Sequence, residues 1–231
     1  WCTTNKQKIP SELEGLVLIK HLRLLKDYAM QLKKLHYLSG LTISLFIGLH
    51  LFNHFISIFG IERHINLMDN LRLIYRNLLV ESILLLAVAT QIFSGIRLFL
   101  SKRKQASSFF ERLQLWTGLY LAFFLIIHVS AVMAGRFVLD LDTNIYFGTA
   151  GLNTFPFNIF FIPYYSLAII SLFGHTAAIH AQKMKTAILG ISVHQQSRII
   201  LFLGVTLTLI TLYGLTNGFT RIEIPAAYKV M

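Results

Sequence analysis

Five long apolar stretches dominate the sequence. They cover about residues 37–59, 79–100, 115–135, 157–181 and 198–218, and each approaches or exceeds the roughly 20 residues that a helix needs to cross the hydrocarbon core of a bilayer. Charged residues make up 13% of the chain, about half of what soluble domains carry. The sequence therefore predicts an all-α integral membrane protein with five transmembrane helices.

The distribution of Lys and Arg predicts how these helices are oriented. Of the 21 Lys and Arg residues, fifteen lie in residues 1–35, at the end of the second span and in the loop after it, or from the loop after the fourth span to Arg198 at the start of the fifth. The other six lie on the opposite side. Because Lys and Arg concentrate on the cytoplasmic side, we expect the N-terminus inside and the C-terminus outside. The net charge of +11 then reflects topology and attraction to anionic lipids in the bilayer, and we expect no nucleic acid partner.

The spans divide the chain into three segments. Residues 1–35 form an N-terminal segment that suits an amphipathic helix, either lying on the inner membrane surface or packing on a soluble partner subunit. Residues 36–218 form the transmembrane domain, and residues 219–231 an external C-terminal tail. Within the domain, the loop at 61–78 is amphipathic and predicts a short interfacial helix over the mouth of the bundle. The loop at 136–156 is rich in Gly, Asn and Asp, and we expect it to be solvated.

Two stretches of the chain read as copies of one another. Residues 34–50 read KLHYLSGLTISLFIGLH, and residues 112–128 read RLQLWTGLYLAFFLIIH. Both contain a hydroxyl–Gly pair, a Phe, and a His ten residues after the Gly; the pairs are Ser39-Gly40 and Thr117-Gly118. We interpret the first and third spans as equivalent members of a duplicated two-helix unit. Two such units predict a four-helix bundle whose interior can hold a cofactor, with the fifth span peripheral.

The repeat places His50 and His128 at the same depth. At a rise of 1.5 Å per residue, each lies about 20 Å from the inner end of its helix. Ionisable side chains inside a membrane are costly and are functional by default. Two imidazoles at one height favour axial ligation of one haem b, and the small residues Gly48 and Ala122 would let a flat macrocycle approach. Histidines hydrogen-bonded across the bundle are the alternative interpretation, and other metals remain open.

Two further histidines lie inside the predicted spans. His54 is one turn after His50, and we expect it to support the site at the outer mouth. His175 lies in the fourth span, and its counterpart in the second span is Gln91. Glutamine is a poor haem ligand, so a second haem at this level is disfavoured. His175 remains a candidate five-coordinate ligand or hydrogen-bond partner.

The spans contain few carboxylates. Glu81, at the outer end of the second span, is expected to form an ion pair with Arg72 or Arg76. Diiron and copper oxidases need clusters of carboxylate or histidine ligands, so the sequence disfavours these classes. The single cysteine, Cys2, excludes a disulfide within the chain.

Two short motifs resemble those of a known family. The sequence Leu35-His36-Tyr37-Leu38-Ser39-Gly40 resembles the L-H-R-x-S-G opening of the first membrane helix in the cytochrome b anchor subunits of succinate dehydrogenase and fumarate reductase. The sequence Gln91-Ile-Phe-Ser-Gly95-Ile-Arg97-Leu98 is similar to the H-x-x-x-G-I-R-H segment of their second helix. The resemblance covers about residues 33–180. It implies a bundle that anchors a flavoprotein and an iron–sulfur subunit and passes electrons to quinone, often through haem b.

The chain departs from this family at three positions. Tyr37 replaces the quinone-linked arginine, Gln91 replaces a haem-ligating histidine, and Leu98 replaces a further histidine. The resemblance carries over Ser39 as a quinone contact and Arg97 as a haem-propionate or quinone-side charge.

These observations predict a cytochrome-b-like membrane anchor or electron-transfer subunit of a respiratory, complex II-like redox complex, located in an energy-transducing inner membrane. Its predicted site residues are His50, His128, His175, Ser39 and Arg97. It would be a non-catalytic subunit, because the chain has no flavin or nucleotide motif. The alternative is a haem-free structural subunit that scaffolds a larger membrane complex.

Overall fold

The computed structural model describes residues 11–229, with side chains from residue 15 onwards; residues 1–10, which include Cys2, and residues 230–231 lie outside the described part. Within it the chain is helical and contains no strand. The elements are α1 (Ser11–Ile56), η1 (Ser57–Phe59), α2 (Ile61–Tyr75), α3 (Leu78–Lys102), α4 (Phe109–Phe137), α5 (Ile145–Asn153), α6 (Asn158–Lys183), α7 (Val193–Leu215) and η2 (Ala226–Tyr228). Five of these helices, α1, α3, α4, α6 and α7, are long and apolar enough to cross a membrane, as the sequence predicted.

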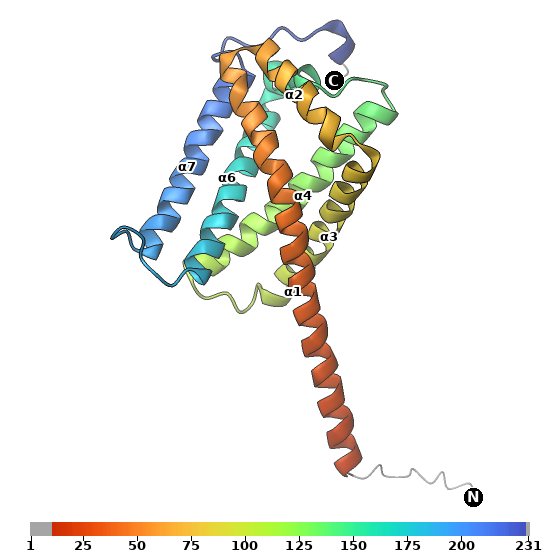
Figure 1. Cartoon of the computed structure of the whole chain (residues 1–231), viewed down its shortest axis with the longest axis vertical. Helices are drawn as coiled ribbons and strands as arrows, with labels where there is room; N and C mark the ends of the chain where they lie inside the picture. The colour runs from red at the N-terminus through yellow and green to blue at the C-terminus, as the bar shows by residue number, and fades with distance from the viewer. Residues whose placement is uncertain (1–10, 230–231) are drawn as a thin grey trace, which may run out of the picture.

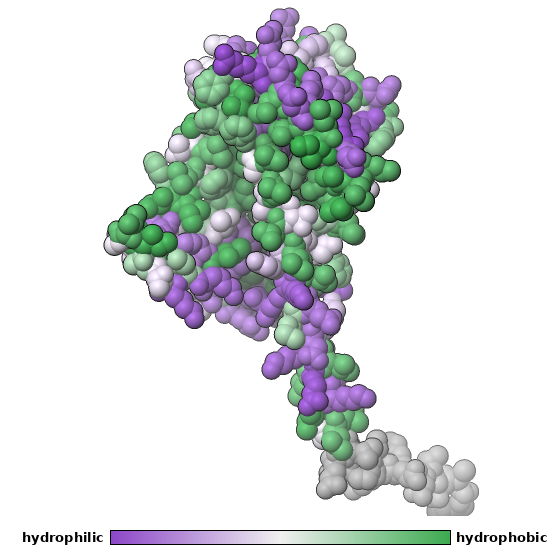
Figure 2. Space-filling model, in the orientation of Figure 1, coloured by the Kyte–Doolittle hydropathy of each residue, from purple (hydrophilic) through white to green (hydrophobic). Residues whose placement is uncertain are grey.

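The five long helices pack in the order in which they occur in the chain. α1 packs against α3, α3 against α4, α4 against α6 and α6 against α7 (Figure 1). The fifth span, α7, packs on α6 and also contacts α1 and η1. On the face shown in Figure 2, apolar side chains form a band across the bundle and hydrophilic ones gather at its two ends. This is the surface of a multi-pass membrane protein in contact with lipid.

The two ends of the bundle differ in how they are closed. At one end lie η1, α2, α5 and the C-terminal segment, and we call it the capped end (Figure 1). At the other end lie the loops at 103–108 and 184–192, and we call it the loop end. Here the sequence sets the helix starts, because Ser108 with Glu111 and Ser192 with Gln195 form capping boxes at the N-termini of α4 and α7.

Helix α1 is longer than a membrane requires. Its 46 residues extend about 69 Å, more than twice the roughly 30 Å of a hydrocarbon core. The helix runs without a break through residue 35, so the predicted surface helix is continuous with the first span. Figure 1 shows its N-terminal part projecting past the loop end of the bundle. The boundary drawn at residue 35 is therefore not a break in the backbone.

The buried residues of α1 and η1 lie on one face. Positions 32, 39, 43, 53 and 57 are the buried ones among residues 15–59, and all fall on a single series with alternating spacings of three and four. We call this face the α1 seam; it consists of Leu32, His36, Ser39, Ile43, Phe46, His50, Asn53 and Ser57. The seam faces the interior of the bundle. The α1 side chains that hydrogen-bond to other helices are His36, Ser39 and Asn53, which lie on the seam, and His54, which does not.

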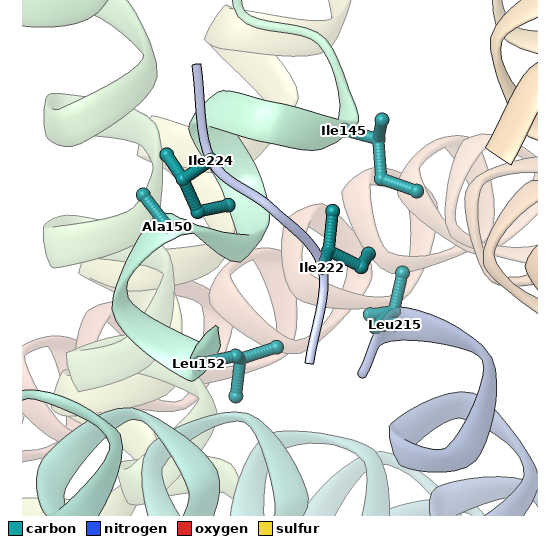
Figure 3. Packing of buried hydrophobic residues seen from close by; sticks show 6 residues of the cluster. All are labelled: Ile145, Ala150, Leu152, Leu215, Ile222 and Ile224. Carbon is teal, nitrogen blue, oxygen red and sulfur yellow. The ribbon is translucent and has the colours of Figure 1, made fainter. Parts of the chain in front are cut away.

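The capped end has its own apolar core. Six buried residues from α5, the end of α7 and the C-terminal segment pack together (Figure 3); they are Ile145, Ala150, Leu152, Leu215, Ile222 and Ile224. The prediction of a solvated loop at 136–156 was therefore wrong, because α5 forms within it and is buried. The C-terminal tail, expected to be external, packs into the same core through Ile222 and Ile224.

A single side chain joins the three parts of this core. Asn153 donates from Nδ2 to the carbonyl oxygens of Thr149 and Leu215, at 2.9 and 3.0 Å. Its Oδ1 accepts from the backbone N–H of Ile222 at 2.9 Å. These bonds satisfy backbone groups that would otherwise be buried without a partner, so Asn153 fastens the C-terminal segment to α5 and α7.

We expect Asn153→Ala to lower the free energy of unfolding by about 1–3 kcal/mol, because it leaves the buried Ile222 N–H and Leu215 carbonyl unpaired. The measurement is unfolding of the purified protein in mixed detergent micelles. The control is Asn70→Ala, which removes an exposed amide bonded only to its own helix and should change the stability by less than about 0.5 kcal/mol. Equal effects of the two substitutions would contradict the assignment.

Candidate functional site

His50 of α1 and His128 of α4 face each other inside the bundle. Their ring centroids are 6.1 Å apart and their planes meet at 64°. Both side chains are half-buried. No hydrogen bond joins the two rings, and within the described residues each has at least one nitrogen without a hydrogen-bond partner. The structure thus brings together the pair that the repeat placed at one level, without the direct hydrogen bond of the alternative interpretation.

Aromatic rings support both histidines in the same way. Phe46 stacks on His50 with centroids 5.6 Å apart, and Phe124 stacks on His128 at 5.0 Å. The planes of these pairs are 19° and 13° apart, respectively. Each Phe is four residues before its His, which places it one helical turn away on the same face. The duplication seen in the sequence is therefore repeated in the packing around the site.

A chain of histidines connects this pair to the capped end. His50 Nε2 lies 3.1 Å from His54 Nε2, and His54 Nδ1 lies 3.3 Å from His64 Nε2. The amide of Asn53 contacts the same His64 nitrogen at 3.2 Å. His64 belongs to α2, the short helix that the sequence predicted over the mouth of the bundle. The site therefore contains residues from three helices.

His64 is not among the site residues that the sequence predicted. The side chain is only 1% exposed. A signal was present, because His64 and Met68 are four residues apart in an amphipathic segment, and both turn out to be buried on its inner face. Sequence alone did not show which face of this helix turns towards the bundle.

The polar atoms near His64 are incompletely paired. His64 Nδ1 and Asn53 Oδ1 are buried and have no hydrogen-bond partner among the described residues. Burial, with a smaller contribution from charge repulsion by the nearby His50 and Arg72, lowers the pKa of His64 from 6.5 to about 4. His64 is therefore neutral at pH 7, and its imidazole can both donate and accept a hydrogen bond.

A second polar cluster lies nearer the loop end, between α1 and α3. Ser39 donates to Gln91 Oε1 at 2.7 Å, and Gln91 Nε2 donates to His36 Nε2 at 3.3 Å. His36 Nδ1 donates to Ser94 Oγ at 2.9 Å, and Ser94 donates to the Thr90 carbonyl at 2.5 Å. Every group in this series has a partner, so the cluster is a closed hydrogen-bond network, in contrast to the histidine chain.

His175 occupies the matching place in the second unit. A side chain at Gly40 would meet the Gln91 amide, and one at Gly118 would meet the His175 ring. The counterpart relation between Gln91 and His175 is therefore visible in the packing. It also means that side chains, and no macrocycle, fill the space beside these two glycines. His175 Nδ1 donates to the Gln114 carbonyl at 3.0 Å, so it acts as a hydrogen-bond partner.

The remaining predicted residues lie away from the histidine pair. Ser39 is buried within the closed network, and its hydroxyl also lies 2.8 Å from the Leu35 carbonyl. Arg97 is exposed, with its guanidinium over the Phe93 ring at 5.4 Å. Gly48 is exposed with open space around it, so it does not face a cofactor, whereas Ala122 is buried.

The ion pairs at the capped end differ from those expected. Glu81 pairs with Arg136 of α4, so the prediction of Arg72 or Arg76 as its partner was wrong. These two arginines instead contact Asp142, at 3.0 and 3.7 Å. The sequence could not select among them, because the choice depends on how the loop after α4 folds back over α2.

Among the described residues, no group of three or more His, Cys, Asp and Glu side chains is arranged to hold a metal ion. Models of protein families, curated proteins and solved structures were compared with the chain, and none matches. The fold is thus an all-α, membrane-spanning bundle with an interior histidine pair.

We expect Gln91→Leu to lower the free energy of unfolding by about 1 kcal/mol, because it removes the shared partner of Ser39 and His36 from the closed network. Unfolding in detergent by increasing the fraction of dodecyl sulfate measures this change. Thr42→Val is the matched control, since its exposed hydroxyl bonds only to the Leu38 carbonyl of the same helix. An unchanged stability of the Gln91 variant would contradict the network.

The lowered pKa of His64 predicts a pH dependence of stability. The unfolded chain binds a proton at this position below about pH 6.5, whereas the folded protein binds it only near pH 4. Stability from this group is therefore present above pH 6.5 and is lost as the pH falls towards 4. Thermal unfolding between pH 7.5 and 4.5 should show a smaller decrease for His64→Gln than for the unsubstituted protein, and an equal decrease would contradict the assignment.

Proposed function

We propose that this protein is a membrane-embedded electron-transfer subunit that holds one haem b between His50 and His128. The observation that carries the proposal is the approach of these two imidazoles inside the bundle, at 6.1 Å between ring centroids. When bound, the haem would supply one-electron redox chemistry. The chain itself would supply one nitrogen each from His50 and His128 to hold it, the orientation of the two rings and an apolar surrounding.

The spacing of the two rings fits ligation of one metal atom from both sides. A bond from a histidine nitrogen to a metal is about 2 Å, and the ring centre lies about 1 Å beyond that nitrogen, so two rings sharing one metal have centroids about 6 Å apart. His50 and His128 would together hold the haem from α1 and α4. Phe46 and Phe124 restrict the rotation of the two rings, which supports a fixed ligand geometry.

The residues around His50 support the same role. His54 contacts His50 and is itself held by His64, so the orientation of the His50 ring is coupled to α2 at the capped end. At the loop end, Ser39, Gln91 and His36 direct their hydrogen bonds to one another and to Ser94. We therefore assign the haem to the histidine pair alone and do not propose a second haem beside Gln91.

The proposed context is a complex II-like respiratory assembly. The resemblance of residues 33–180 to the cytochrome b anchor subunits supports a flavoprotein and an iron–sulfur subunit as partners, with quinone as the electron acceptor. Substrate oxidation would belong to those partners. An assembly of this kind would lie in an inner, energy-transducing membrane, and the bias of Lys and Arg supports the N-terminus inside and the C-terminus outside.

A second candidate function is a haem-free structural subunit of a membrane complex. The observation that favours it is the closed network at Gln91, where the resembled family has a haem-ligating histidine. In that position the chain has replaced a ligand by a hydrogen-bonded side chain that joins α1 to α3.

A reduced-minus-oxidised optical spectrum of the purified protein, prepared with its complex intact, separates the two functions. We expect the difference band of a b-type haem. We expect His50→Ala and His128→Ala each to remove most of it, because each substitution removes one axial ligand. Haem content by pyridine haemochrome assay should fall in parallel.

His21→Ala is the matched control, since His21 is exposed on α1 far from the pair and should leave the spectrum unchanged. Size-exclusion chromatography verifies that each variant retains its complex. Absence of the band from the intact complex would overturn the haem proposal and favour the structural subunit.

A further inference from the structure

The α1 seam continues beyond the bundle. Extending its spacing of three and four residues from Leu32 towards the N-terminus gives the positions of Ala29, Leu25, Leu22 and Leu18. Leu32 is 9% exposed, whereas Leu25, Leu22 and Leu18 are 51, 56 and 58% exposed. The face that packs on α3 inside the bundle therefore extends past the loop end as an apolar stripe without a partner among the described residues.

The length of the projecting part is sufficient for a coiled-coil contact. Residues 11–31 extend roughly 30 Å along the helix axis, and residues 15–31 are exposed or half-buried throughout. Figure 2 shows apolar and hydrophilic side chains together on this part of α1. Apolar surface of this extent on one helix is typical of an interaction site. The spacing of three and four residues along the seam is the one with which a helix packs against a second helix.

The charges beside the stripe select the kind of helix that fits. Lys26 follows Leu25 directly and Lys33 follows Leu32, so both flank the seam, whereas Lys20, Arg23 and Asp27 lie on the opposite side of the helix. No acidic residue flanks the seam at 18–33. A second copy of this helix would bring lysines near the seam with no carboxylate from residues 18–33 to pair them, so the charges of this stretch oppose self-association, and an acidic helix complements them.

We propose that the projecting part of α1 is the docking site for an acidic amphipathic helix of a partner protein. Apolar side chains of that helix pack along Leu18, Leu22, Leu25 and Ala29, and its Glu or Asp side chains lie beside Lys26 and Lys33. The contact continues the interface between α1 and α3 beyond the end of α3 at Lys102. It requires no haem and is independent of the function proposed above.

Site-specific photocrosslinking of the full chain in its native membranes tests this inference. The photoreactive amino acid p-benzoylphenylalanine is introduced at Leu22 or Leu25 on the seam, and at Arg23 or Asp27 as matched outward controls. We expect a protein adduct at the two seam positions with at least a fivefold higher yield than at the controls. Mass spectrometry of the crosslinked peptide should identify an acidic segment with apolar residues at spacings of three and four.

Charge reversal gives a second measurement on the same adduct. Lys26→Glu combined with Lys33→Glu should reduce the seam adduct severalfold, whereas Lys20→Glu combined with Arg23→Glu, which changes the net charge equally on the outer face, should not. Size-exclusion chromatography confirms that both variants keep the bundle folded.

Several outcomes would overturn the proposal. They are an adduct with twice the mass of the chain, which indicates self-association; adducts to lipid at the seam positions, which indicate a helix lying on the membrane; equal yields at all four positions; and no adduct at the seam. A captured segment that is basic or lacks the apolar spacing also contradicts the proposal.

Discussion

Burial of polar side chains along one face of α1 is the constraint on which the arrangement of the bundle depends. A polar group inside an apolar bundle is costly unless it is hydrogen-bonded, so each polar position of the α1 seam fixes what must lie opposite it. At the level of His36 and Ser39 the partners are supplied by α3, and the network is closed. At the level of His50 and Asn53 pairing is incomplete, because Asn53 Oδ1 and His64 Nδ1 have no partner among the described residues. The level of His36 and Ser39 therefore joins α1 to α3, whereas the level of His50 and Asn53 retains imidazole nitrogens without a partner among the described residues.

At the level of the closed network, the two units of the duplication have histidine and glutamine on opposite helices. In the first unit the histidine is on the odd helix, as His36, and the glutamine on the even one, as Gln91. In the second unit the order is reversed, with Gln114 on α4 and His175 on α6. A hydroxyl–Gly pair accompanies each. The histidine level shows no such exchange, since both units retain Phe and His on the odd helix. The two contacts differ in kind, because Gln91 and His36 bond through their side chains, whereas His175 bonds to the backbone carbonyl of Gln114.

The features that the sequence predicted well are those encoded in one helix. Apolar length determined the five spans, and the rise per residue placed His50 and His128 at one level. The features that it missed depend on contacts between distant segments. The burial of His64 depends on which face of α2 meets the bundle. The choice of Arg136 as the partner of Glu81 depends on the end of α4, 55 residues away. α5 is buried in a region whose Gly and Asn residues predicted a loop, because the C-terminal segment covers it, and local composition contains no information about that cover.

The attachment of the C-terminal segment by Asn153 has a consequence for the order of assembly. Chains are made from the N-terminus, so the five long helices exist before Ile222 and Ile224 are synthesised. The core of the capped end lacks these two residues until then, and α5 has neither its cover nor the bond from the Ile222 N–H. The core at this end of the bundle, beside the histidine chain, is thus completed only after the five long helices have been made.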